Sequence, residues 1–157
     1  SAVQLLMKSR AQLKHTRFCL DFGVHFRHPP ALSFVVGNGL VPSASDYRPQ
    51  EFGNAALVMV GAPFSLRFAR DRGQVFVDAG SSAAGWHKLE YVLEFVDNSV
   101  TQQQLGEPPD PAAMANLLQL NWDRVVSLFS DQQKTSQLQA FAKQKSAALV
   151  GRLFRKP

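Results

Sequence analysis

Residues 64 to 79 carry the pattern that most restricts the fold of this chain. In the first part of this stretch, apolar side chains alternate with polar or small ones: Phe64, Leu66 and Phe68. An alternating chain places such residues on one face of a β-strand. A second strand-like run follows at 74 to 79, after the short connection Asp71-Arg72-Gly73. Gly73 suits the left-handed backbone position of a short bulged turn, so the pattern predicts an antiparallel β-hairpin.

Further strand signals lie before the hairpin. Residues 17 to 26 alternate cleanly, and residues 55 to 61 form a continuous apolar run. Between them, residues 31 to 36 are a second apolar run, which the turn signal at 37 to 39 closes. We therefore expect an antiparallel sheet of about four to five strands. Residues 40 to 54 are rich in Pro, Ser, Gly and Asn, which favours a long surface loop.

Helical spacing dominates the two ends of the chain. A short amphipathic helix is predicted at 2 to 14, and another at 86 to 97, where Tyr91 and Phe95 keep a strand open as an alternative. The segment from 102 to 111 contains three prolines and is expected to be a stiff linker. Asp110 is placed to cap a helix that has Pro111 at its first position and runs to about residue 130. A last helix is predicted from 132 to 154.

The length of 157 residues is close to the usual size of one domain, so we expect a single α+β domain over 1 to 157. In this domain an N-terminal helix and two to three helices from the C-terminal half pack on the sheet. The longest apolar stretches are well short of the roughly 20 residues that a membrane span needs. No secretory signal is visible at the start, and a single cysteine, Cys19, agrees with a reducing, cytoplasmic location.

The net charge of +5 is unevenly distributed. Four bases precede the first acid, Asp21, and residues 132 to 157 hold six bases without an acid. A basic amphipathic helix can lie on nucleic acid or on an anionic surface. The residues that would carry this activity are Lys134, Lys143, Lys145, Arg152 and Arg155. The alternation of aromatic and basic residues that is typical of RNA-binding strands is missing, so this function is the alternative and not the first choice.

No motif for catalysis, for a cofactor or for a metal is visible. The four histidines, at 15, 25, 28 and 87, lack the spacing of a metal-binding set. Ser81 and Ser82 lack the second glycine of a nucleophile elbow, which favours a turn or capping role. Glu90 and Glu94 are expected to share the solvent side of a helix. An enzyme would need a dispersed site, such as His25 or His28 brought beside Asp21 or Asp78, and is the least favoured class.

The hairpin arginines are the best local candidates for a contact surface. Arginine pairs readily with carboxylates and phosphates, and long loops are often functional. We expect the three arginines to cluster on the outer side and the tip of the hairpin, and we expect the protein to act through them and through the 40 to 54 loop. The candidate partner-binding residues are Arg67, Arg70, Arg72, Tyr47 and Arg48. Arginines there can also serve only to keep the sheet soluble and to block edge pairing.

The run from Phe64 to Asp78, followed by Trp86-His87-Lys88-Leu89-Glu90, resembles small bacterial domains of the immunity-protein kind. The resemblance covers about residues 52 to 97. It implies a non-enzymatic, cytosolic protein that binds and blocks a toxin. The basic balance differs from the acidic one expected for inhibitors of nuclease toxins, and this would indicate another class of toxin. Pairing of exposed strand edges leaves a homodimer open as well.

Overall fold

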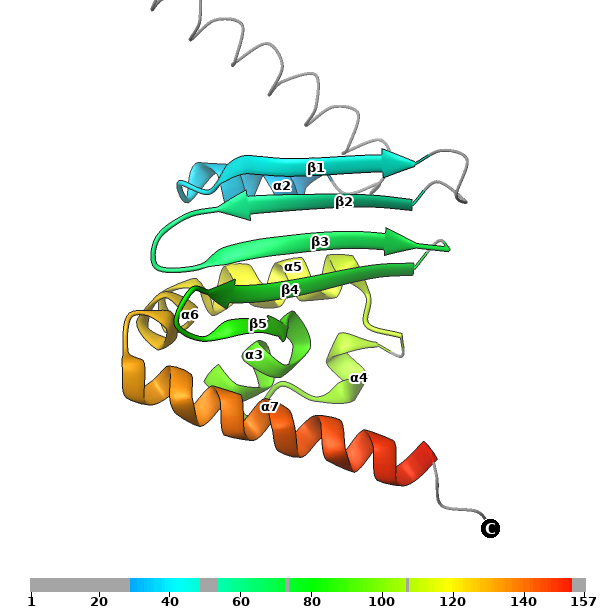
Figure 1. Ribbon diagram of the computed structural model, residues 1–157, viewed down its shortest axis with the longest axis vertical. Helices are drawn as coiled ribbons and strands as arrows, with labels where there is room; N and C mark the ends of the chain where they lie inside the picture. Colours follow the sequence, from blue (N-terminus) through cyan, green and yellow to red (C-terminus); the bar gives the residue numbers. More distant parts are fainter. Residues whose placement is uncertain (1–28, 49–53, 73, 107, 154–157) are drawn as a thin grey trace, which may run out of the picture.

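The computed structural model describes residues 29–48, 54–72, 74–106 and 108–153. They form a five-stranded antiparallel sheet in which every strand lies beside its neighbours in sequence, in the order β1-β2-β3-β4-β5 (Figure 1). The strands are β1 (Val41–Arg48), β2 (Asn54–Val60), β3 (Ser65–Asp71), β4 (Gln74–Ser81) and β5 (Gly85–Lys88). Together with the helices that follow it, this sheet confirms the predicted α+β class.

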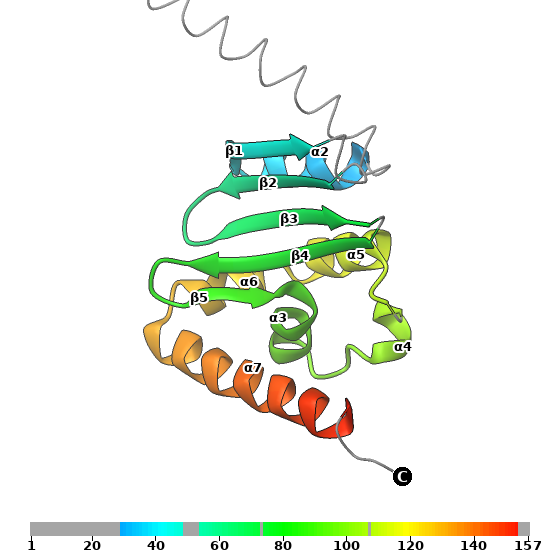
Figure 2. The same cartoon turned by 45° about the vertical axis from the view of Figure 1, so that its right-hand side comes forward.

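The helices lie on one side of the sheet and along one of its edges. One helix, α2 (Pro29–Gly37), precedes the sheet, and the others follow it: α3 (Leu89–Val96), α4 (Gln102–Leu105), α5 (Pro111–Leu120), α6 (Trp122–Phe129) and α7 (Gln132–Leu153). In both views α2, α5 and α6 lie behind the sheet, while α7 runs below β5 and α3 (Figures 1 and 2). Among the described residues, the front face of the sheet carries no helix.

The core forms between the rear face of the sheet and the helices. Cross-strand partners place buried residues of three strands in one row, since Met59 pairs with Leu66 and Leu66 pairs with Ala79. The fully buried ring of Phe64 stacks on Phe129 of α6, with 5.2 Å between the ring centroids. Trp122 packs against the same ring at 5.1 Å. These contacts bring α6 against the corner that leads into the hairpin.

The hairpin that the alternating pattern predicts is confirmed. Strands β3 and β4 pair in register from Ser65 with Gly80 to Asp71 with Gln74. Arg72 in the turn has a positive φ of 49°, so this arginine adopts the left-handed conformation. Gly73, which was expected to do so, lies outside the described residues.

The surface loop predicted at 40 to 54 is wrong, because residues 41 to 48 form the edge strand β1. This strand pairs with β2 from Val41 with Val60 to Arg48 with Asn54, and the register shifts after Pro42. An edge strand needs partners on one side only, so it tolerates proline and exposed polar residues. Its composition therefore resembles that of a loop.

The apolar run at 31 to 36 belongs to a helix, α2, and not to the sheet. Pro29 and Pro30 stand at its start, where the missing N–H groups cost little. The predicted turn after it is confirmed, with Gly39 at a φ of 88°. The predicted helix at 2 to 14 and strand at 17 to 26 lie outside the described residues.

The helix predicted at 86 to 97 begins three residues later, since Trp86 and its neighbours form β5. Both alternatives for this segment are therefore partly right. The predicted linker at 102 to 111 contains the short helix α4, whose Leu105 is buried. Because leucine is buried there, the segment is packed on the core and is more than a connection.

The C-terminal helices follow the predicted pattern with one interruption. Asp110 caps α5, as expected, by accepting hydrogen bonds from the N–H groups of Ala112 and Ala113. The helix expected to run to about residue 130 is broken at the buried Asn121, whose side-chain amide donates to the Leu117 carbonyl at 3.1 Å. Helix α7 spans residues 132 to 153, close to its prediction. None of the described helices is long and apolar enough to cross a membrane.

Two leucine-to-alanine substitutions test where the core lies. Leu66 is 0% exposed on β3, whereas Leu120 at the end of α5 is 80% exposed. Leu66→Ala should lower the free energy of unfolding by about 2 to 5 kcal/mol, because it removes buried methyl groups and leaves a cavity. Leu120→Ala should change it by less than about 0.5 kcal/mol. Urea unfolding followed by circular dichroism measures both, and similar effects of the two would contradict this core.

Candidate functional site

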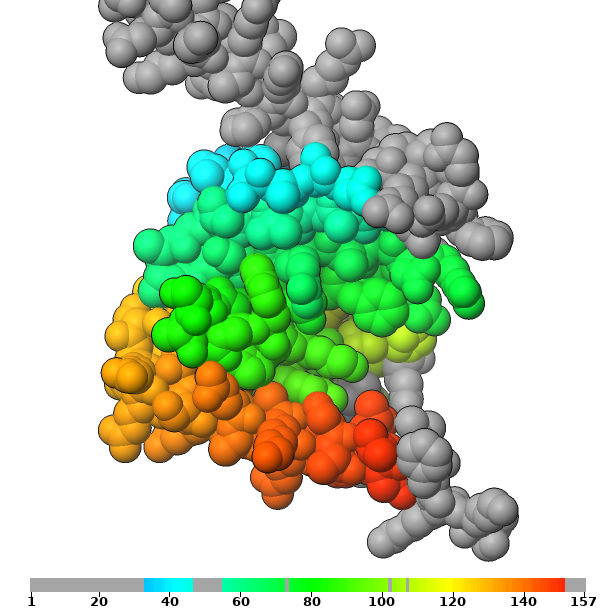
Figure 3. Space-filling model, in the orientation of Figure 1, coloured from blue at the N-terminus to red at the C-terminus, as the bar shows by residue number. Residues whose placement is uncertain are grey.

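The uncovered face of the sheet carries an aromatic and charged group, which we call the outer cluster: Arg67, Phe76, Asp78 and Trp86. Phe76 is 46% exposed and Trp86 is 42% exposed. Arg67 donates two hydrogen bonds to Asp78 Oδ2, from Nε at 2.9 Å and from Nη2 at 2.7 Å. Its guanidinium carbon lies 5.0 Å from the centre of the Trp86 ring. Figure 3 views the molecule from this side, where side chains of the strands form the surface.

The strands position the outer cluster through their register. Arg67 lies directly opposite Asp78 on β4, and Trp86 lies opposite Gly80. A Cβ atom on Gly80 would come within 2.9 Å of the Trp86 ring, so glycine allows the indole to lie close to the sheet. The ion pair is partly solvated, so it contributes at most about 1 kcal/mol to stability. Its main effect is to hold the arginine beside the tryptophan.

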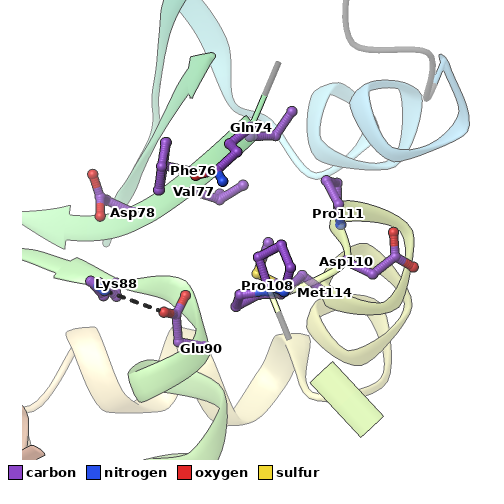
Figure 4. A pocket seen from close by; sticks show the side chains of 12 residues that line it. Gln74, Phe76, Val77, Asp78, Lys88, Glu90, Pro108, Asp110, Pro111 and Met114 are labelled. Atoms are coloured by element: carbon purple, nitrogen blue, oxygen red, sulfur yellow. Dashed lines mark ion pairs between the residues drawn. The ribbon is translucent and has the colours of Figure 1, made fainter. Parts of the chain in front are cut away.

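A pocket adjoins the outer cluster at the edge of the sheet (Figure 4). It has a volume of about 360 Å³ and lies between β4, the junction of β5 with α3, and the segment that enters α5. A second hollow of about 640 Å³ continues between α3 and α7. The two share Lys88, Glu90 and Pro109, so they adjoin each other, and we call them together the groove.

Glu90 stands at the junction of the two hollows. Its side chain is 17% exposed, and Lys88 Nζ lies 3.7 Å from its carboxylate. Burial raises the pKa of Glu90 above its ordinary value of 4.5, and the nearby Lys88 ammonium only partly offsets this effect. Glu94, one turn later, pairs with Lys145 of α7. The expectation that the two glutamates share a solvated face is therefore wrong, because both are largely covered and paired.

The described residues at this site offer few groups for catalysis or for metal binding. A buried carboxyl beside a lysine can hold a cation or donate a proton. No group of three or more His, Cys, Asp or Glu among the described residues could hold a metal ion. The Ser81 hydroxyl accepts a hydrogen bond from the Ala84 N–H at 3.1 Å, which is the predicted turn role. Of the residues named for a dispersed active site, Asp78 lines the pocket and binds Arg67, and the others lie outside the described residues.

The structure separates the hairpin arginines that were expected to cluster. Arg67 belongs to the outer cluster, whereas Arg70 pairs with Ala55 and Val75 in the register and so emerges on the opposite face. Arg72 is exposed in the turn. Tyr47 and Arg48 lie on β1, opposite Ala55 and Asn54, and their side chains lie outside the described part of the structure.

The lysines of α7 do not form one basic surface. Lys134 donates to the Ser127 hydroxyl at 2.9 Å, and Lys145 pairs with Glu94 and lies over the ring of Phe141. Lys143 is exposed, about 180° around the helix from Lys134. The side chain of Arg152 and the whole of Arg155 lie outside the described residues. Lys145 therefore lies on the side of α7 that faces α3.

Comparisons of the chain with known protein families, with curated proteins and with solved structures find no match.

Three important residues were not identified from the sequence as parts of a site. The sequence patterns place Trp86 in a helix, Phe76 in a hairpin strand and Glu90 on a solvated surface. Trp86 and Lys88 are two residues apart, and this spacing is the signal that could have placed both side chains on one face of a strand. Glu90 lines one pocket together with the 108 to 111 segment, which no local pattern in the sequence brings near it.

The environment of Glu90 makes a prediction about its titration. Carbon-13 NMR of the side-chain carboxyl should show a pKa above 4.5. Lys88→Met should raise this pKa further, because it removes the neighbouring positive charge. The matched control Lys134→Met removes a lysine that binds elsewhere, and it should leave the Glu90 titration unchanged.

The sign of the effect on stability follows from proton linkage. The folded state holds the Glu90 proton more tightly than the unfolded chain, so this contribution is fully present below pH 4.5 and is lost as pH rises through the raised pKa. Glu90→Gln should therefore gain stability relative to the wild type as the pH rises from about 4 to 7. A Glu90 pKa at or below 4.5 would contradict this account of the site.

Proposed function

We propose that this chain is a non-enzymatic protein-binding domain whose contact surface is the outer cluster. The observation that carries the proposal is the pair of exposed rings, Phe76 and Trp86, on a sheet face that no described helix covers. Side chains of this size usually face a core. Two of them at the surface of one sheet face, on either side of an ion pair, suit a partner that buries them.

The composition of the outer cluster supports the same proposal. Tryptophan and arginine are the residues that most often dominate binding energy at protein interfaces, usually at the centre of a contact. Arg67 is held by Asp78 and by the Trp86 ring before any partner arrives. Since its geometry is already set, binding would cost little side-chain entropy. The charges of Arg67 and Asp78 cancel, which suits a partner without strong net charge at this point.

In its more specific form, the proposal is an immunity-type inhibitor that binds a bacterial toxin in the cytoplasm. The resemblance to immunity domains rests on the strands that carry Arg67, Phe76 and Trp86. A neutral, aromatic contact surface agrees with a toxin other than a strongly basic nuclease, as the basic balance of the chain also indicates. The protein encoded by the neighbouring reading frame is then the expected partner.

Coexpression with that neighbouring protein tests the proposal. Wild-type chain should elute with it as one complex in size-exclusion chromatography. Trp86→Ala should weaken the complex about tenfold or more in calorimetric titration, as expected for a central aromatic residue. The control Leu120→Ala removes another exposed apolar side chain, on α5, and should bind like the wild type.

Two outcomes would count against the proposal. Equal binding by the wild type and Trp86→Ala, with circular dichroism showing both folded, would remove the outer cluster from the interface. A neighbouring protein that forms no complex would contradict the immunity assignment. Light scattering of the chain alone distinguishes self-association, and a dimer that Trp86→Ala dissociates would keep the surface but replace the toxin by a second copy.

A further inference from the structure

Strand β4 is longer than the strand that covers its lower edge. β4 spans eight residues, whereas β5 pairs only with its second half, from Asp78 to Ser81. Among the described residues, no strand pairs with Gln74–Val77 on that side. Figure 1 shows β5 ending about halfway along β4, where the chain turns away into α3. The sheet therefore keeps an open edge beside the pocket.

The hairpin geometry determines which backbone groups face that edge. Asp71 and Gln74 face each other across a turn of two residues. In a hairpin with such a turn, the two flanking residues exchange both of their backbone hydrogen bonds. Alternation then directs the N–H and C=O groups of Val75 and Val77 away from β3. Ala79, two residues further, uses the same orientation to pair with His87 of β5. Val75 and Val77 thus offer the donors and acceptors with which another strand could continue the ladder.

The opposite wall of the pocket cannot supply the strand that would continue the ladder. It is formed largely by Pro108, Pro109 and Pro111, which have no N–H group to donate to the carbonyls of β4. Met114 of α5 adds an apolar floor. Figure 4 shows this wall across the pocket from Gln74 and Val77. The space between the walls is thus bordered by one hydrogen-bonding edge and one apolar side.

The charges of the pocket favour a basic occupant. The described residues that line it include three acids and one base, Lys88. Asp78 already accepts from Arg67, and Asp110 accepts from the first N–H groups of α5. Glu90 is paired with Lys88, at 3.7 Å, and lines both hollows. A cationic side chain that entered the groove would find its partner there.

The other edge of the sheet is less suited to this role. β1 contains Pro42, and its register shifts between Pro42 and Ala44. Both features disfavour hydrogen bonding of this edge to another strand. The Gln74–Val77 edge has no proline and no register shift within the described residues. Of the two, the edge of β4 is the better template for a further strand.

We propose that the open edge of β4 binds an extended peptide segment with a basic side chain, which adds a strand in line with β5 and pairs with Glu90. This is recognition by strand addition, in which backbone hydrogen bonds supply affinity and side-chain pockets supply specificity. The inference deepens the proposed protein-binding function and rests on it, because the segment would belong to the partner. The edge adjoins the outer cluster through Phe76 and Asp78, which line the pocket.

A synthetic peptide tests the inference without the partner. The probe is a capped five-residue peptide, Thr-Val-Lys-Val-Thr, at about 1 mM, the range expected for a weak single strand. Hydrogen exchange measured by NMR should show unprotected Val75 and Val77 amides in the free chain and slower exchange with the peptide. The same peptide with Glu in place of Lys should bind about tenfold more weakly. A peptide N-methylated at its ladder amides should not bind.

Two matched variants separate the edge from its surroundings. Val75→Pro removes an edge N–H and leaves the hydrogen bonds to β3 in place, so it should weaken binding of the lysine peptide, whereas Val75→Ala keeps the N–H and should bind. Glu90→Gln should reduce the preference for lysine over glutamate.

Failure of this inference differs from failure of the proposed function. Val75 and Val77 amides that are protected in the free chain, or a lysine peptide that leaves their exchange unchanged, would overturn strand addition. If Trp86→Ala still weakens the partner complex in that case, the outer cluster remains the contact surface. Loss of partner binding by both Trp86→Ala and Val75→Pro, with Val75→Ala unaffected, would support both proposals.

Discussion

One face of the sheet is buried against the helices, and this burial determines that the alternate side chains of each strand point to the open face. Leu57, Met59, Leu66 and Val77 all lie on the covered face, and each is almost completely buried. A shift of one residue in any strand would expose this set, so the register is strongly specified. The residues between them, including Arg67 and Phe76, are therefore held on the open face. The geometry of the outer cluster is a consequence of core packing.

The same packing explains why the pocket lies beside β4. Leu89, Val92 and Leu93 of α3 are buried, so the chain must leave the sheet after the short strand β5 to place this helix in the core. β4 continues beyond that point because β3 pairs with it along its full length. The capped start of α5 then brings the proline segment opposite the remaining edge. Groove and edge thus arise from unequal strand lengths around a common core.

Local patterns in the sequence predict the parts of this fold that local chemistry determines. The hairpin, the capping of α5 by Asp110 and the extent of α7 depend on alternation, capping residues and helical spacing, and all are confirmed. The edge strand β1 was not predicted, because an exposed strand has no apolar face to mark it. The burial of Glu90 was not predicted either, since it depends on tertiary packing, and the segment that lines the pocket with it lies about twenty positions away in the sequence. The outer cluster was found in part, through Arg67, whereas Trp86 was assigned to the wrong element.

The central claim is that the open face of the sheet is a contact surface. Hydroxyl-radical footprinting of the full chain, alone and with its partner, tests this claim most directly, because it reports the solvent exposure of individual side chains. The account predicts that Phe76 and Trp86 are oxidised in the free chain and protected in the complex, while the highly exposed Leu120 reacts equally in both. Shielding of Trp86 in the free chain, or unchanged reactivity of both rings in the complex, would contradict it.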